Sequence, residues 1–229
     1  MTSALDRVRR YYLERDRGGL EAANTLREKP HRYTMQSLER ALLDVLTREG
    51  LDDLSGATLL DVGCGTGHWL TRFALYGAEP THMTGIDLLQ GRAALAARRH
   101  PAATIVSADA QRLPFVAEQF DLVAQFVLLS SILEDVARVR IAREMLRVLR
   151  PGGAVVAYDF IWNPRNANTR GLRQRDYRRL FPGCDIRFTR VTLAPPIARR
   201  LAGLSFIACQ VLEKVVFLRS HYIVVVRKR

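Results

Sequence analysis

Three glycines alternate with other residues in the segment Leu59–Gly67, which reads Leu-Leu-Asp-Val-Gly-Cys-Gly-Thr-Gly. Glycine adopts backbone dihedrals that other residues avoid, and it lets a ligand approach the main chain closely. The residues before the first glycine are apolar apart from Asp61, as in a buried strand. A helix starting after Gly67 would direct its N-terminal N–H groups at the ligand. The segment therefore predicts a strand, a ligand-binding loop and a helix.

The glycine spacing separates two common kinds of nucleotide site from this one. The dinucleotide-binding fingerprint has a further Gly or Ala immediately after the third glycine position, where this sequence has His68. A phosphate-binding P-loop requires Gly-Lys-Ser/Thr, which the segment lacks. A tight turn that binds no ligand is the structural alternative.

Two aspartates follow the next two predicted strands. Asp87 ends the strand 83–87, where a carboxylate can accept hydrogen bonds from both hydroxyls of a ribose. Asp109 follows the strand 104–108 and is placed to accept from an adenine amino group. Either aspartate could instead cap a helix or a turn.

From residue 58 onward, short β-branched runs alternate with helical stretches, which is the pattern of a parallel sheet covered by helices. The predicted strands are 58–62, 83–87, 104–108, 122–127, 154–160, 186–193 and 221–226. The predicted helices are 36–49, 67–76, 90–99, 134–149, 168–180 and 196–217. Residues 1–35 are expected to form a helical cap or lid, and residues 36–229 one α/β domain.

Five segments occur in the order found in one family: the glycine loop, Asp87, Asp109, Phe120-Asp121-Leu122-Val123 and Pro151-Gly152-Gly153. Together they resemble the class I S-adenosylmethionine-dependent methyltransferases, in particular the ubiquinone/menaquinone-biosynthesis-like branch. The resemblance covers about residues 36–160. It implies a Rossmann-like seven-stranded sheet of order 3-2-1-4-5-7-6, with strand 7 antiparallel and helices on both faces.

The resemblance also implies the cofactor, S-adenosyl-L-methionine, and the residues that bind it. Gly63, Gly65 and Gly67 would lie against the methionine part, with Asp61 near its amino group. Asp87 would hold the ribose. Asp109 and the backbone of Ala110 would face the adenine, and Gln125 or Phe126 would lie near the sulfonium. Cys64 and Leu88 are also expected to bind the cofactor.

The catalytic candidates lie where the fourth, fifth and last strands end or begin. A methyl group on a sulfonium is already activated, so a general base is needed only for a hydroxyl or a protonated amine. Asp159 is the first candidate for a base or an acceptor-orienting group, followed by Tyr158 and His221. Their structural alternatives are a carboxylate paired with an arginine and a histidine that only packs. Ser131 and Glu134 also fit a helix capping box.

The composition excludes some classes of function. The net charge of +12 could attract nucleic acid or an anionic membrane, but the basic residues are scattered, so we favour a compositional origin. No Asn-Pro-Pro-Tyr/Phe-type tetrapeptide follows the fourth strand, which weakens the case for an RNA base as acceptor. The three cysteines and five histidines show no metal-ligand spacing. We expect a cytoplasmic enzyme, without a metal, that methylates O or N of a small molecule or saccharide.

Three alternatives remain open from the sequence. The enzyme could act on a lipid-linked acceptor through peripheral membrane contact of residues 201–218, which have Arg199, Arg200, Arg219 and Lys228 nearby. It could methylate RNA or protein, or it could be a regulator that binds the cofactor without transferring a methyl group. The cap residues expected to close over the site are Tyr11, Tyr12, His31 and Tyr33. The sequence predicts no oligomeric state.

Overall fold

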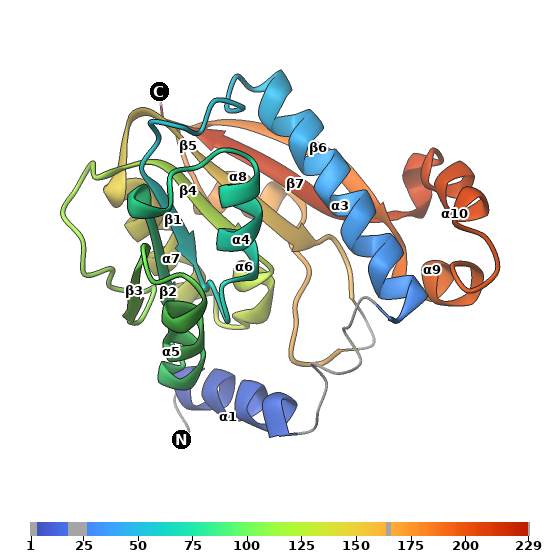
Figure 1. Cartoon of the computed structure of the whole chain (residues 1–229), viewed down its shortest axis with the longest axis horizontal. Helices are drawn as coiled ribbons and strands as arrows, with labels where there is room; N and C mark the ends of the chain where they lie inside the picture. Colours follow the sequence, from blue (N-terminus) through green and yellow to red (C-terminus); the bar gives the residue numbers. More distant parts are fainter. Residues whose placement is uncertain (1–3, 18–26, 164–165, 229) are drawn as a thin grey trace.

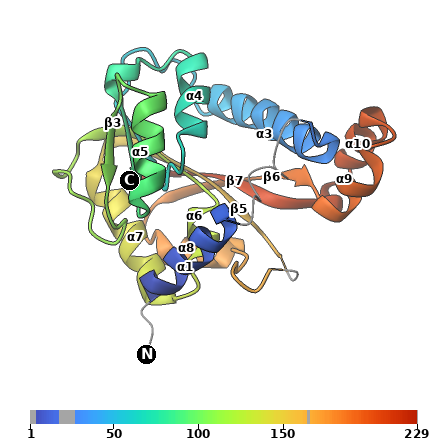
Figure 2. The ribbon, with the colours of Figure 1, turned by 60° about the horizontal axis from the view of Figure 1, so that its bottom comes forward.

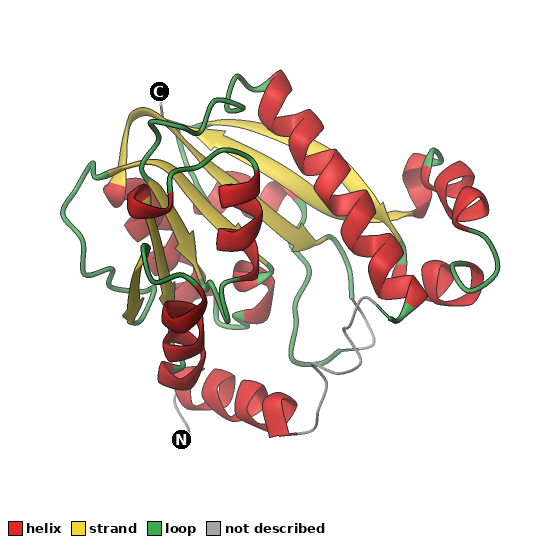
Figure 3. Cartoon of the chain, in the orientation of Figure 1, coloured by secondary structure: helices red, strands yellow, loops and turns green. Residues whose placement is uncertain are grey.

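The computed structural model describes residues 4–17, 27–163 and 166–228 of the chain, and residues 1–3, 18–26, 164–165 and 229 lie outside this description. Seven strands form one sheet of order β3-β2-β1-β4-β5-β7-β6 (Figures 1 and 3). The strands are β1 (Leu59–Val62), β2 (Met83–Asp87), β3 (Thr104–Ser107), β4 (Phe120–Phe126), β5 (Leu149–Phe160), β6 (Asp185–Leu193) and β7 (Arg219–Arg227). Strands β1 to β5 pair in parallel, whereas β7 is antiparallel to both β5 and β6. The predicted Rossmann-like sheet is confirmed.

Helices cover both faces of this sheet. They are α1 (Ala4–Arg17), α3 (Lys29–Arg48), α4 (His68–Leu75), α5 (Gln90–Arg99), α6 (Leu128–Ser131), α7 (Asp135–Val148), α8 (Gln174–Leu180), α9 (Pro195–Leu201) and α10 (Phe206–Glu213), with 3-10 turns η1 (Pro80–His82) and η2 (Val216–Leu218). The cluster on one face includes residues of α3 and α4, and the cluster on the other includes residues of α7 and α8.

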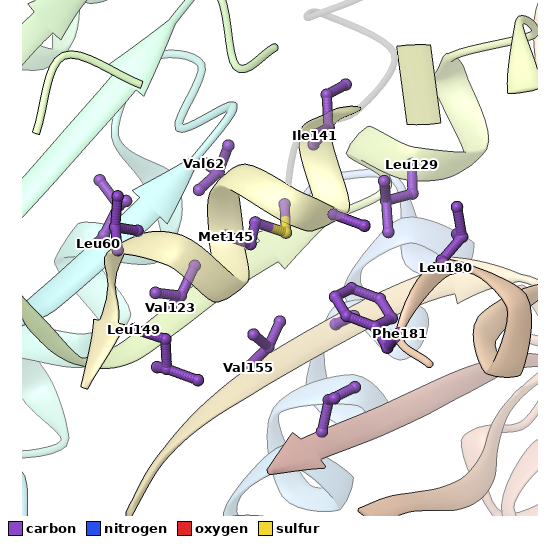
Figure 4. Close-up of a cluster of buried hydrophobic side chains, with 14 of the residues drawn as sticks. Leu60, Val62, Val123, Leu129, Ile141, Met145, Leu149, Val155, Leu180 and Phe181 are labelled. Carbon is purple, nitrogen blue, oxygen red and sulfur yellow. The ribbon is translucent and has the colours of Figure 1, made fainter. Parts of the chain in front are cut away.

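Side chains of β1, a central strand of the sheet, pack in both clusters. Leu59 packs in the α3–α4 cluster, whereas Leu60 and Val62 pack in the α7–α8 cluster, and all three are fully buried. Figure 4 shows Met145 of α7 close to the sheet residues of the second cluster. A parallel strand between two helical layers must be apolar on both faces, which explains the continuous run in the sequence.

The predicted helix over 196–217 is wrong, because the segment folds as α9, α10 and η2. Ser205 is the N-cap of α10, and its hydroxyl accepts a hydrogen bond from the backbone N–H of Ala208 at 3.1 Å. A serine side chain that satisfies an N-terminal N–H group starts a new helix. The apolar segment is thereby divided into two short helices that turn back on each other (Figure 1).

Other predicted boundaries also differ from the structure, and the helix predicted over 168–180 begins only at Gln174. The helix predicted over 36–49 begins at Lys29, with Pro30 in its first turn, where the missing N–H of proline costs no intrahelical bond. The expected division between residues 35 and 36 therefore falls inside α3. The predicted capping box is also wrong, because α6 intervenes: the hydroxyl of Ser131 donates to the carbonyl of Val127 at 2.7 Å, and Glu134 caps no N–H group through its side chain.

No helix in the described part of the chain is both long and apolar enough to cross a bilayer.

Candidate functional site

The glycine loop joins β1 to α4 at the carboxyl edge of the sheet. Gly63 has φ +78° and Gly67 has φ +88°, in the left-handed region that favours glycine. A Cβ atom at Gly67 would lie 2.6 Å from Cδ2 of His100, and one at Gly63 would lie 3.2 Å from Cδ1 of Leu128. The backbone conformation therefore favours glycine at both positions, and a larger residue would also displace a neighbouring side chain.

Asp87 holds this loop against the end of β2. Its Oδ2 accepts from the backbone N–H of Gly65 at 2.9 Å, and its Oδ1 accepts from the backbone N–H of Leu89 at 2.8 Å. Each oxygen of a carboxylate can accept more than one hydrogen bond. The same side chain can therefore fix the loop and accept from the hydroxyls of a ribose.

A pocket lies beside the loop, and we call it the cofactor pocket. Five residues predicted to bind the cofactor line it: Gly63, Asp87, Leu88, Asp109 and Ala110. The other lining residues are Tyr12, Ile86, Leu89, Arg92, Ala108, Gln111, Phe126, Val127, Leu128, Ile132 and Ile141. Apolar walls with two carboxylates suit an adenine nucleoside, whose base stacks on apolar groups and whose amino and hydroxyl groups donate hydrogen bonds.

Hydrogen bonds within the turn after β3 hold the carboxylate of Asp109 in place. Its Oδ1 accepts from the backbone N–H of Gln111 at 2.9 Å, and its Oδ2 accepts from Nε2 of Gln111 at 3.3 Å. Such a turn is typical of an aspartate after a strand. Gln111 also lines the pocket. Apart from its position two residues after Asp109, nothing in the sequence indicates a role for Gln111 in binding.

Asp61 lies beneath the loop in β1 and is 1% exposed. Its Oδ2 has no hydrogen-bond partner among the described residues. Burial, with the charge of Asp87 as a second cause, raises the pKa of Asp61 to about 8. A buried acceptor without a partner is costly, and a cationic amino group would satisfy it. The site therefore fits the amino acid end of S-adenosylmethionine as well as its nucleoside.

Five residues predicted to bind the cofactor, Asp61, Cys64, Gly65, Gly67 and Gln125, are not among the pocket-lining residues. Cys64 is buried, which raises the pKa of its thiol, and it packs so closely on Gly85 that a Cβ there would lie 2.9 Å from its Sγ. Gln125 is fully buried, and its Oε1 accepts from the backbone N–H of Leu128 at 2.8 Å. Of the pair Gln125 and Phe126, it is Phe126 that faces the pocket.

Asp159 lies at the centre of a buried hydrogen-bond network. Its Oδ2 accepts from Nε2 of Gln125 at 2.5 Å and from the hydroxyl of Tyr177 at 2.6 Å. Its Oδ1 accepts from the backbone N–H of Ser130 at 2.8 Å. Burial raises the pKa of Asp159, and these hydrogen bonds oppose the rise. The carboxyl group thereby ties β4, α6 and α8 to the end of β5.

The other two catalytic candidates, Tyr158 and His221, line a second cavity of about 390 Å³, which we call the second pocket. Their rings stack with centroids 4.7 Å apart and 5° between the planes. The remaining lining residues come from α3 and the turn before it, from β5 and α9, and from the end of β4: Glu28, Pro30, His31, Thr34, Met35, Leu38, Val127, Phe160, Pro195, Ala198 and Arg199. Asp159 is absent from this wall because successive residues of a strand point to opposite faces.

Burial shifts the pKa of three side chains in the wall of the second pocket, His221, Tyr158 and His31, in the direction that favours the neutral form. Burial lowers the pKa of His221 to about 3, and the hydroxyl of Ser220 lies 2.9 Å from its Nδ1. Burial raises the pKa of Tyr158, whose hydroxyl lies 3.0 Å from that of Thr192. Burial also lowers the pKa of His31, which is half-buried at the start of α3. From the sequence, His31 was expected only in a lid.

Val127 lines both pockets. It follows β4 in a left-handed conformation with φ +65°, which is uncommon for a β-branched residue. Its backbone N–H donates to the carbonyl of Tyr158 at 2.7 Å. Strain of this kind is retained where the surrounding structure fixes it, commonly at a functional site.

Helix α1 contributes Tyr12 to the cofactor pocket. The hydroxyl of Tyr12 lies 2.8 Å from that of Ser131, and the guanidinium of Arg92 lies 4.6 Å from the centre of its ring. Figure 2 shows α1 beside α6. Among the other cap residues, Tyr33 packs against α9 and α10 and lines neither pocket.

Comparison with known proteins connects this geometry to a family. The family model described as "Methyltransferase domain" matches residues 59–153. The biotin biosynthesis bifunctional protein BioHC of Cellvibrio japonicus is 36% identical over 126 residues, or 52% of this chain and 23% of that protein. Phthiotriol/phenolphthiotriol dimycocerosates methyltransferase 1 of Mycobacterium ulcerans is 38% identical over 112 residues, or 47% of this chain and 39% of that protein. The chain thus spans less than half the length of these two relatives.

A solved structure extends the similarity beyond the matched segment. The [4+2]-cyclase SpnF is 25% identical, with a TM-score of 0.60 over 83% of this chain and 80% of that chain. Residues 59–153 therefore carry a methyltransferase domain, and the sheet has the strand order of the class I S-adenosylmethionine-dependent methyltransferases.

Proposed function

We propose that the chain transfers a methyl group from S-adenosylmethionine to a small molecule bound in the second pocket. The observation that carries this proposal is the position of Val127, which lines both the cofactor pocket and the second pocket. In-line transfer needs donor and acceptor on either side of a single narrow passage, held close together. When bound, the cofactor supplies a methyl group that is already activated as a sulfonium.

The wall of the second pocket indicates the chemistry of the acceptor. Aromatic and aliphatic side chains, among them Met35, Leu38 and Phe160, surround much of the cavity. Polar side chains lie among them and come from separate elements, including Thr34 of α3 and Arg199 of α9. Such a pocket suits a molecule with an apolar body and a small number of polar groups. A nucleophilic oxygen or nitrogen of a biosynthetic intermediate, including one that carries a sugar, is the proposed acceptor atom.

His31 is our candidate for the group that accepts a proton. Burial lowers the pKa of its imidazole, so the neutral form that can take a proton predominates at neutral pH. The imidazole would take up the proton that a hydroxyl or amine of the acceptor loses when it is methylated. His221, with its pKa lowered to about 3, is a much weaker base. Its proposed role, with Tyr158, is to orient the acceptor by hydrogen bonds.

Asp159 is proposed as a positioning residue. It lies outside both pocket walls, and its oxygens accept from Gln125, Tyr177 and the backbone of Ser130. These contacts hold α6, whose residue Leu128 lines the cofactor pocket. We therefore propose that Asp159 acts on transfer only through the shape of the site.

The experiment is incubation of the purified chain with methyl-labelled cofactor and a cell extract, followed by counting of label in separated small-molecule, lipid, RNA and protein pools. Label in the small-molecule pool is expected, and the Asp87→Ala variant should transfer much less at a cofactor concentration that does not saturate it. The His31→Gln variant should bind the cofactor normally and transfer more slowly. Label confined to RNA or protein would contradict the proposed acceptor class.

The similarity to a [4+2]-cyclase makes chemistry without methyl transfer a second candidate. In that case the cofactor would bind but no pool would carry label. Isothermal titration with S-adenosylmethionine, run on the same preparation, separates this outcome from a chain that has lost the cofactor site.

A further inference from the structure

The most concentrated exposed apolar surface in the described residues is formed by α10 and η2. Its members are Leu204, Ile207, Val211, Val215, Val216 and Phe217, which we call the α10 surface. Phe217 is 86% exposed, Leu204 is 84% exposed and Ile207 is 73% exposed. Among the described residues, six of the thirteen exposed large hydrophobic side chains thus lie within fourteen consecutive positions. Apolar residues gathered in this way mark an interaction site, whereas single ones need no explanation.

The orientation of α10 is fixed by its opposite face. Phe206 and Cys209 pack with Tyr33 of α3 in a small core. The carboxylate of Glu213 accepts from the hydroxyl of Tyr33 at 2.6 Å and from the backbone N–H of Leu193 at 3.0 Å. The outward apolar face is therefore presented by a helix whose inner face is already packed and hydrogen-bonded. Figure 1 shows α9 and α10 at one extremity of the molecule, beyond β6.

Exposed basic side chains flank the α10 surface along the chain. Arg199 and Arg200 of α9 and Lys214 after α10 are exposed. Between residues 195 and 219 the only acidic residue is Glu213, and its carboxylate is bonded to α3 and β6. This end of the molecule therefore combines exposed apolar groups with exposed basic side chains, which we call the basic rim, and this combination is complementary to anionic lipid headgroups over an acyl layer.

We propose that the α10 surface docks the protein onto an anionic phospholipid bilayer. The apolar side chains enter the boundary between headgroups and acyl chains, while the basic rim contacts lipid phosphates. Self-association through the same surface would bring the two basic rims together, and like charges at an interface oppose binding. The contact is peripheral, because no helix in the described residues is suited to span a bilayer.

Docking has a consequence for the second pocket. Pro195, Ala198 and Arg199 of α9 line that pocket, and α9 packs directly against α10. A docked α10 surface would hold the pocket close to the bilayer, where an amphipathic acceptor would concentrate. This consequence rests on the proposed function, whereas docking itself does not.

The test is flotation of the full chain with vesicles made of equal parts phosphatidylcholine and phosphatidylglycerol, beside vesicles of phosphatidylcholine alone. We expect binding to the anionic vesicles, weakened by added salt. The double variant Ile207→Ser/Phe217→Ser should need about tenfold more lipid for half-maximal binding, because the inserted apolar area is lost. The matched control is Val116→Ser/Val136→Ser, since these residues are 71% and 65% exposed elsewhere on the surface. It should bind like the unmodified chain.

Two results would overturn the proposal. One is equal binding of the two double variants, which would mean that charge alone attracts the protein to vesicles. The other is absence of binding to anionic vesicles together with formation of a dimer, which analytical ultracentrifugation would detect. If the Ile207→Ser/Phe217→Ser variant abolished that dimer, the α10 surface would be an interface between copies of the chain. Neither result bears on methyl transfer in solution, so the proposed function is tested separately.

Discussion

The carboxylate of Asp87 accepts a hydrogen bond from the backbone N–H of Gly65 at 2.9 Å, which joins the end of β2 to the glycine loop after β1. The residue expected to bind the ribose therefore also sets the position of the loop expected to bind the methionine part. The two halves of the cofactor site are coupled through one side chain.

Asp87→Ala should weaken binding of S-adenosylmethionine by roughly a hundredfold, because charge-assisted hydrogen bonds to the ribose and to the loop are both lost. Isothermal titration measures the affinity, and circular dichroism checks that the fold persists. Asp53→Ala is the control, since Asp53 is exposed and its carboxylate bonds to Ser55. An unchanged affinity in Asp87→Ala would show that the ribose lies elsewhere.

Cofactor binding should release a proton from Asp61. Burial and the charge of Asp87 raise the pKa of Asp61 to about 8 in the free protein, so its carboxyl group is protonated below that pH. The positive charges of the cofactor favour the ionised carboxylate and lower this pKa. Affinity should therefore rise with pH until the amino group of the cofactor loses its own proton, near pH 8. At about pH 6.5, titrations in buffers of different ionisation enthalpy should show release of about one proton.

The matched variant for this prediction is Asp61→Asn, which should release almost no proton at the same pH. Measurement below pH 7 matters because the amino group of the cofactor itself titrates near pH 8. Equal proton release from both proteins would place the titrating group elsewhere. In the free protein, the raised pKa of Asp61 also means that stability falls as the pH rises toward about 8, and Asp61→Asn should lessen this fall.

Tyr177→Phe should destabilise the fold by about 1.5–3 kcal/mol, because the buried carboxyl group of Asp159 loses a strong donor. Urea unfolding measures the change. Tyr222→Phe is the control, since the same hydroxyl is removed from a half-buried tyrosine of β7.

Asp159→Asn separates a positioning role from that of a general base. A positioning role predicts that stability and cofactor affinity fall together in this variant. If Asp159 were the general base, the variant would instead lose transfer at every pH without loss of stability.

His221 should stay neutral well into the acid range. Burial lowers the pKa of its imidazole from 6.5 to about 3. Nitrogen-15 NMR of labelled histidine, with His221→Gln to identify the signal, should show no protonation of this ring down to pH 5. The unfolded chain takes up a proton below about pH 6.5 and the folded chain does not, so stability is full above pH 6.5 and is lost as the pH falls toward 3. A ring that titrates near pH 6.5 would contradict its burial.

The sheet and the cofactor loop were predictable because their signals are local. Alternate glycines, β-branched runs and an aspartate at the end of a strand each follow from the backbone conformation of a few neighbouring residues. The break between α9 and α10 was missed because Leu201–Leu218 is apolar along most of its length, and the cap at Ser205 is a single polar residue within it.

The sequence by itself determined that Tyr158 and Asp159 end a strand at the edge where ligands bind. Only the tertiary structure decided that Tyr158 faces the second pocket and that Asp159 faces Tyr177 of α8. The two side chains alternate across a strand buried on both faces, so no local pattern distinguishes the ligand side from the helix side. The same holds for His31, whose place in the pocket wall depends on α3 packing near the end of β5, more than a hundred residues away in the chain.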